Sequence, residues 1–127
     1  HDLSIFGVTE GAEIVNLKVE NCKIIGEGRL GILTGATFST KIEQVCVLNS
    51  QCENRLSDHG SNAGGMTGPL YRSVVKSCSV QGGNVYAKDC VGGISSSMSK
   101  DSKIIDCYSN CRIEGTINVG GMTGKVN

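Results

Sequence analysis

The 127-residue sequence contains no tryptophan, two phenylalanines and three tyrosines, and it carries no excess charge of either sign. So few large side chains cannot fill a wide globular core, and the interior is therefore expected to be narrow. Twelve basic side chains balance twelve acidic ones. This balance argues against a nucleic-acid partner or an anionic membrane, because both demand a basic excess. No run of roughly 18 apolar residues occurs either, so direct membrane insertion is not expected.

The start of the chain, HDLSIFGV, lacks the charged and apolar regions of a signal peptide. It also lacks an initial Met, which predicts a processed product or a piece of a longer chain. Leu and Ala together number only 11, whereas Ile and Val number 23, and Gly, Ser and Asn number 18, 14 and 9. Because β-branched residues favour strands and Gly, Ser and Asn favour turns, a turn-rich all-β protein with few helices is predicted.

A glycine-rich tetrad recurs along the chain and is the strongest pattern in the sequence. The first glycines of its four copies stand at steps of 33, 28 and 28 residues: Gly31, Gly64, Gly92 and Gly120. A second glycine follows in three copies, at Gly65, Gly93 and Gly121, whereas the first copy has Ile32 there. Ser96 replaces the final glycine of the third copy. The copies are expected to stack as a glycine corner, with local distortion where Ile32 and Ser96 stand.

Each tetrad copy is followed by an apolar stretch, and we predict strands over residues 14–19, 42–48, 74–80 and 104–109. A second strand is predicted where Ile113, Ile117 and Val119 alternate with polar residues. Equivalent strands of successive copies would pair in parallel at about 4.8 Å per coil. The sequence therefore predicts a β-solenoid of about four coils of 28–33 residues. We expect a single segment over 1–127, with the tail of an earlier coil at 1–13 and coils at about 14–41, 42–73, 74–103 and 104–127.

The stretch CYSNCRIEG at 107–115, followed by VGGMTG at 119–124, resembles the GLUG-motif repeats of bacterial surface adhesins. Similar repeats occur in the N-terminal regions of IgA1-protease-type zinc metallopeptidases. The opening IFGVTEGAEIVNL at 5–17 is similar to the beginning of such an array. The resemblance covers nearly all of the chain and is weakest in the second repeat. It implies a right-handed parallel β-helix in an extracellular or cell-surface protein.

Seven cysteines are present: Cys22, Cys46, Cys52, Cys78, Cys90, Cys107 and Cys111. An odd number leaves at least one thiol unpaired within the chain. Counting from the tetrads predicts one structural column of Cys46, Cys78 and Cys107, either as small buried thiols or with one or two disulfides. Cys22 and Cys111 are expected to share another column three coils apart, roughly 14 Å, which is beyond disulfide reach.

We expect no metal site, no cofactor and no enzymatic activity. The cysteines lack the C-x2-C pairs of zinc sites, and the two histidines, His1 and His59, do not supply a ligand set. No H-E-x-x-H motif is present. The aspartates Asp89, Asp101 and Asp106 fall at different positions of the repeat, so no cluster of catalytic carboxylates is expected.

Two places are candidates for a binding surface. The polar run over 53–62, with Asp58 and His59, is predicted to be a solvated loop and a variable contact site. Tyr71, Tyr86 and Tyr108, with Arg72 and Arg112, could form a sugar-binding face, because aromatic rings stack on pyranose rings; isolated packing or surface positions are the alternative. The hydroxyl column of Thr34, Thr67, Ser95 and Thr123 is expected to be a structural ladder rather than an ice-binding surface, which needs two ranks.

The function predicted from these patterns is a non-catalytic spacer or adhesion segment of an extracellular or cell-surface repeat protein. Its expected partners are neighbouring coils or a capping domain of the same protein, because unpaired strand edges recruit partners. A host or cell-surface glycan or protein is a further expected partner. A carbohydrate-binding or carbohydrate-processing β-helix and a rigid structural component of a larger assembly are the alternatives.

Overall fold

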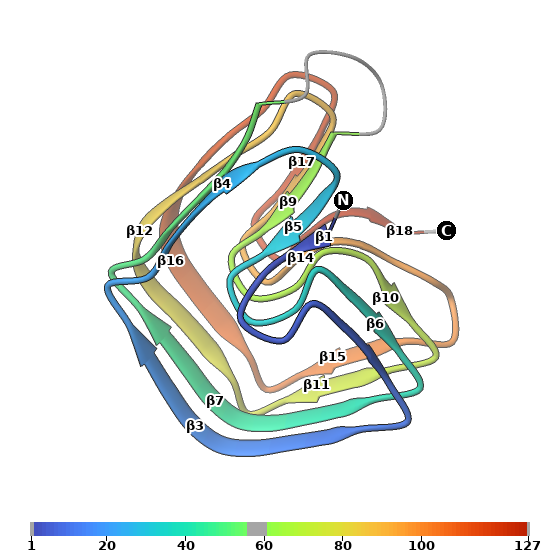
Figure 1. The fold of residues 1–127 in the computed structure, drawn as a ribbon. Coiled ribbons are helices and arrows are strands. Elements are labelled where there is room, and N and C mark those ends of the chain that lie inside the picture. The colour runs from blue at the N-terminus through green and yellow to red at the C-terminus, as the bar shows by residue number, and fades with distance from the viewer. Residues whose placement is uncertain (1, 56–60, 127) are drawn as a thin grey trace.

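The computed structural model describes residues 2–55 and 61–126, which form strands and turns in three sheets (Figure 1). Asp58 and His59 lie outside the described residues. Sheet A consists of β1 (Asp2–Leu3), β5 (Arg29–Gly31), β9 (Asn62–Gly64), β13 (Cys90–Gly92) and β17 (Asn118–Gly120). Sheet B consists of β2 (Val8–Glu10), β6 (Ala36–Phe38), β10 (Leu70–Tyr71), β14 (Ser95–Met98) and β18 (Thr123–Val126).

Sheet C contains the longest strands. It consists of β3 (Glu13–Glu20), β4 (Lys23–Gly26), β7 (Lys41–Leu48), β8 (Gln51–Asn54), β11 (Val74–Lys76), β12 (Ser79–Tyr86), β15 (Lys103–Ile105) and β16 (Tyr108–Glu114). The described residues form no helix with the length and hydrophobicity of a membrane span.

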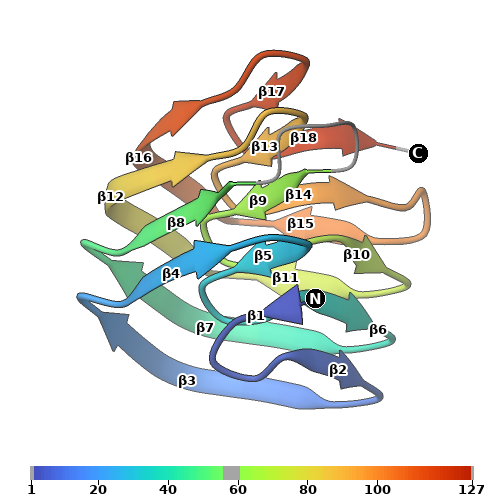
Figure 2. The ribbon, with the colours of Figure 1, turned by 45° about the horizontal axis from the view of Figure 1, so that its top comes forward.

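The chain passes through sheets A, B and C in turn, and we call each such passage a circuit. Four circuits span residues 2–26, 29–54, 62–86 and 90–114, and 118–126 supply the sheet A and sheet B strands of a fifth. Equivalent strands of successive circuits pair in parallel, as between Asn62, Cys90 and Asn118 in sheet A. The circuits superimpose when viewed along the stack and rise from blue to red when it is tilted (Figure 2). The all-β class and the parallel pairing of successive copies are confirmed.

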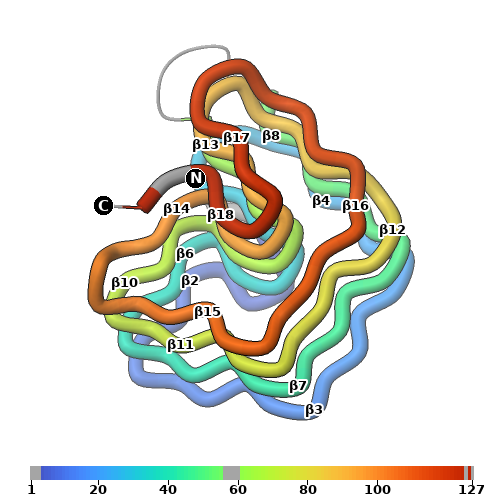
Figure 3. Tube along the Cα trace, turned by 180° about the vertical axis from the view of Figure 1, so that it is seen from behind, coloured from blue at the N-terminus to red at the C-terminus, as the bar shows by residue number. Residues whose placement is uncertain are grey.

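The first glycines of the four tetrads are direct neighbours in sheet A, where Gly31 pairs with Gly64, Gly64 with Gly92 and Gly92 with Gly120. Between sheets A and B the chain curls toward the middle of the cross-section (Figure 3). A Cβ on Gly64 would lie 1.8 Å from the carbonyl oxygen of Thr67. The predicted glycine column therefore exists, and a close approach of backbone rather than a positive φ is what requires it.

The hydroxyl column lies inside this curl. Thr34, Thr67 and Ser95 pair in sequence and are fully buried, and the Thr34 and Thr37 hydroxyls are 2.6 Å apart. An ice-binding surface has to face water, and these three members do not; only the fourth, Thr123, which pairs with Ser95, is partly exposed. The distortion expected at Ser96 does not occur in the pairing, because Ser96 N donates to the Thr67 carbonyl at 3.2 Å. Its hydroxyl is instead buried without a hydrogen-bond partner among the described residues.

The predicted strand through Ile113, Ile117 and Val119 is wrong as one element. β16 ends at Glu114 in sheet C, and β17 begins at Asn118 in sheet A, so the chain changes sheets between them. A Cβ on Gly115, in this connection, would lie 2.6 Å from a methyl carbon of Val91. Alternation of apolar and polar residues continued across the bend and concealed it.

Candidate functional site

The corners of the cross-section are formed by residues with positive φ, a conformation that non-glycine residues seldom adopt. One corner, between sheets B and C, stacks Gly11, Ser39 and Arg72, with φ of 61°, 49° and 48°. The two bends within sheet C stack Asn16, Gln44, Ser77 and Asp106 at one position and Asn21, Asn49 and Gly82 at the other. Each column places the same turn in successive circuits, so the sheets meet at constant positions.

A hydroxyl or thiol directly follows the positive-φ residue at six of these places: Cys22, Thr40, Ser50, Ser73, Cys78 and Cys107. The last five side chains donate to the carbonyl two residues earlier, at 2.9, 3.0, 2.8, 3.2 and 3.2 Å respectively. Four of them also accept a backbone N–H from the preceding circuit, the donors being Ala12, Cys22, Thr40 and Val45. One small polar side chain thus stabilises the bend and joins it to the circuit before it.

The predicted cysteine column is correct for two members and wrong for the third. Cys78 and Cys107 stack directly, because the pairing on both sides of them keeps one register. Val45, not Cys46, occupies their column in the second circuit, since Ser79 pairs with Cys46. The error arose because counts of ten and eleven residues after the tetrad were both accepted. The connection between Met98 and Lys103 has one residue more than that between Leu70 and Val74, which makes eleven correct for Cys107. The first two copies have connections of equal length, so ten is correct for Cys78 and gives Val45.

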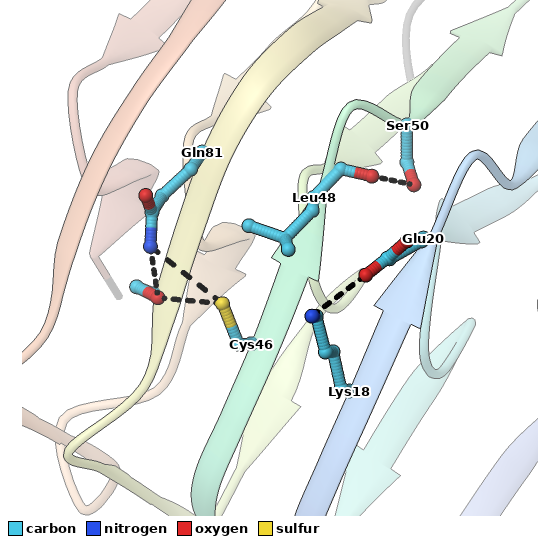
Figure 4. Close-up of polar contacts among 7 residues, drawn as sticks. Lys18, Glu20, Cys46, Leu48, Ser50 and Gln81 are labelled. Atoms are coloured by element: carbon cyan, nitrogen blue, oxygen red, sulfur yellow. Dashed lines mark hydrogen bonds and ion pairs between the residues drawn. The ribbon is translucent and has the colours of Figure 1, made fainter.

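Cys46 consequently faces outward on sheet C. The Ser79 hydroxyl donates to its sulfur at 3.2 Å, and the Gln81 side-chain amide donates to it at 3.6 Å (Figure 4). The Lys18–Glu20 ion pair of 2.7 Å lies beside it on the neighbouring strand. Cys46 therefore belongs to the polar outer surface and not to the core.

All seven cysteines are described, and all are free thiols. The Cys78 thiol is hydrogen bonded to Cys107, and this contact lowers the pKa of the Cys107 thiol to about 7. The same contact, together with burial, raises the pKa of Cys78. Of the two neighbouring thiols, the half-buried Cys107 therefore has the lower pKa. Within residues 2–55 and 61–126 no three His, Cys, Asp or Glu side chains are grouped for a metal ion.

The structure does not bring the predicted binding tyrosines together. Tyr71 is the last residue of β10 in sheet B, and its ring stacks on that of Phe38 at a centroid distance of 4.8 Å. Its neighbour Arg72 points back along the corner, and its Nε donates to the Ser39 hydroxyl at 3.4 Å. These contacts stabilise the corner and leave neither side chain directed toward Tyr86 or Tyr108.

Tyr108 and Tyr86 both lie on the outer face of sheet C, in different columns. Tyr108 begins β16 beside Ser79, and 52% of its surface is exposed. Tyr86 ends β12, with Glu53 paired on one side of it and Glu114 on the other. Tyr86 lines a pocket with a volume of about 430 Å³, and neither Tyr71 nor Tyr108 is among the residues that line it.

The pocket has walls formed by two outward-facing columns of sheet C. One column contains Gln51, Asn84 and Arg112, and the other contains Glu53, Tyr86 and Glu114. The intervening residues of β8 and β12, Cys52 and Val85, point into the core and leave their backbone as the floor. The site is therefore a polar depression with one aromatic ring, built from three successive circuits.

The two carboxylates of the pocket, Glu53 and Glu114, each form an ion pair with an arginine two residues away in the sequence. Arg112 contacts Glu114 at 2.8 Å, and Arg55 contacts Glu53 at 2.7 Å. The two carboxylates are therefore already engaged with cationic partners.

The sequence analysis named Tyr86 and Arg112 as parts of a possible sugar-binding face and missed Gln51, Glu53, Asn84 and Glu114. The signal was present, because residues two apart on a strand face the same side and the three circuits align at 51/53, 84/86 and 112/114. These pairs form columns only in the exact register between β8, β12 and β16. The two residues Gly82 and Gly83 make that register irregular at this point.

Comparison with protein families, curated proteins and solved structures gives no match to this chain. The resemblance to GLUG-motif repeats therefore stays a prediction.

Proposed function

We propose that the chain is a right-handed parallel β-helix, or β-solenoid, of about four coils that acts as a non-catalytic spacer or adhesion segment of a repeat protein. The stacked columns support this proposal, because a rod of identical spacings holds side chains at fixed intervals and lets weak contacts add. The resemblance to GLUG-motif repeats supports a protein at the cell surface or outside the cell as the setting.

The observation that carries the proposal is the exposed core at both ends of the stack. Leu30, Ala63 and Val91 are fully buried in one column of sheet A, whereas 47% of Val119, next in that column, is exposed. At the other end half of Val8 is exposed, while its neighbour Ala36 is buried. Apolar residues with this pattern support a further coil or a capping domain as the partner of each end.

A rigid component of a larger assembly would use the same stacked ends, with another protein in place of the next coil.

Insertion of a second copy of residues 90–117 after residue 117 tests the proposal. Cys90 pairs with both Asn62 and Asn118, so the inserted segment continues the existing register. An extra coil should raise the denaturation midpoint and lengthen the particle by about 4.8 Å in X-ray scattering.

The control is an insertion of the same residues in scrambled order, which should lower the midpoint. If the ordered insertion leaves the midpoint unchanged or lowers it as the scrambled one does, stacking of coils is not the basis of stability and the spacer proposal fails.

A further inference from the structure

We propose that the pocket around Tyr86, on the outer face of sheet C, binds a neutral saccharide. The inference rests on the proposed function, because stacked circuits are what hold the two columns of the pocket side by side. The pocket volume of about 430 Å³ falls within the range of small-molecule sites.

The floor of the pocket excludes recognition by strand addition. β8 pairs with β4 on one side and β12 on the other, and β12 also pairs with β16. The backbone N–H and C=O groups of β8 and β12 are therefore engaged within the sheet, whereas β16 pairs with β12 alone among the described strands. A peptide that binds as an added strand needs an unpaired edge. The unpaired edge of β16 lies on its side away from β12, so a ligand over the floor formed by β8 and β12 has to be recognised by side chains.

The charges of the pocket favour a neutral ligand. Glu114 is paired with Arg112 and Glu53 with Arg55, at 2.8 and 2.7 Å. A cation would compete with two arginines for the carboxylates, and an anion would meet the carboxylates beside Arg112. An uncharged polar ligand avoids both penalties.

The remaining groups match the chemistry of sugar hydroxyls. The side-chain amides of Gln51 and Asn84 and the hydroxyl of Tyr86 each donate and accept hydrogen bonds. Within the described part of the chain, none of these three side chains makes a hydrogen bond to another residue. Sugar hydroxyls also donate and accept, so each of these groups can be satisfied by a saccharide.

Tyr86 supplies the apolar part of the site. About 42% of its surface is exposed, and the C–H face of a pyranose ring can cover an aromatic ring while the hydroxyls at its edge reach the neighbouring polar groups. Tyr71 is already stacked on Phe38. Tyr108 is exposed without lining the pocket, which makes it a matched control.

The test is a titration of the full 127-residue chain, followed by two-dimensional NMR, with cellohexaose, maltohexaose and chitohexaose. Oligogalacturonate and a lysine-rich peptide are the charged counterparts. At least one neutral oligosaccharide should shift the amide signals of Gln51, Asn84 and Tyr86. Tyr86→Ala should weaken that binding by about tenfold or more, whereas Tyr108→Ala should leave it unchanged.

Asn84→Ala provides a second variant, since Asn84 is exposed and its loss removes two hydrogen-bonding groups without removing the ring. It should also weaken binding, and far-UV circular dichroism shows whether each variant is folded. Binding only to the charged ligands, equal binding by Tyr86→Ala, or no binding of neutral sugars up to about 10 mM would overturn the inference. A coil insertion that still raises stability would leave the spacer function standing in each of those cases.

Discussion

At the scale of single residues, stability depends on positions where the backbone tolerates one kind of side chain. The corners with positive φ include non-glycine residues whose φ is near 50°, among them Ser39, Gln44, Arg72, Ser77 and Asp106. Each such residue lowers the stability of the fold by about 1–3 kcal/mol. Hydroxyls and thiols that follow most of these residues offset the cost with bonds to the carbonyl two residues back. The glycine column adds a second requirement, because a Cβ there would overlap the backbone.

Gly64→Ala should destabilise the protein strongly, because its Cβ would overlap the Thr67 carbonyl oxygen and neither group can move without breaking the curl. We expect a loss of about 3 kcal/mol or more, measured by urea denaturation. Gly121→Ala is the control, since a Cβ on Gly121 meets nothing within 4 Å and its φ is not positive. Equal effects of the two substitutions would contradict the steric explanation.

Ser96→Ala should stabilise the protein, because the Ser96 hydroxyl is buried without a partner among the described residues while its Cβ already fits. Removal of an unsatisfied buried hydroxyl is worth about 1–3 kcal/mol. Ser95→Ala is the opposite case, since the Ser95 hydroxyl donates to the Ser97 carbonyl at 2.6 Å. A midpoint that falls for Ser96→Ala would show that the hydroxyl has a partner after all.

Cys52 should make the protein sensitive to alkaline pH. Burial raises the pKa of its thiol from 9.0 to about 12, so the folded state favours the neutral thiol. This stabilisation is complete below pH 9 and is lost as the pH rises toward 12, by up to about 4 kcal/mol. Cys52→Val, which places Val beside Val85 in the same column, should reduce the slope of stability against pH above 9. An unchanged slope would show that Cys52 is not the responsible group.

At the scale of strands and corners, the register is what decides which side chains meet. The stacked glycines and the parallel pairing could be predicted, because the tetrads recur at steps that match the pairing in sheet A. The offset of Cys46 was missed because one extra residue between Met98 and Lys103 makes eleven the correct count for Cys107, whereas ten is correct for Val45 and Cys78. The pocket also depended on this register, so only Tyr86 and Arg112 could be named in advance.

Ser73→Ala tests the hydrogen bonds that join the corner between sheets B and C to the preceding circuit. The Ser73 hydroxyl accepts the Thr40 N–H at 3.1 Å and donates to the Tyr71 carbonyl at 2.8 Å, and it is buried. Its loss should cost about 1–3 kcal/mol and speed hydrogen exchange of the Thr40 amide. Ser73→Cys should lose less, because Cys78 performs the same role at the next bend. If Ser73→Ala leaves the hydrogen exchange rate of the Thr40 amide unchanged, the Ser73 hydroxyl does not join the two circuits.

At the scale of the whole molecule, three sheets of parallel strands enclose a narrow core. The core is covered around its sides and open at both ends of the stack. A stack with this form gains stability with each added circuit, since every internal circuit is covered on two sides. The same form explains why the middle circuits contain the fully buried side chains, such as Met66, Val75 and Ile94, while Val119 and Val126 are exposed.

The pairing of equivalent residues in successive circuits is the central claim, and backbone NMR of the labelled chain tests it most directly. We predict contacts between the Hα and amide protons of parallel partners 28 residues apart, from Asn62 to Cys90 and from Cys90 to Asn118, and 33 apart between Gly31 and Gly64. Close Hα–Hα contacts between antiparallel neighbours, or contacts shifted by one residue along the glycine column, would contradict the account.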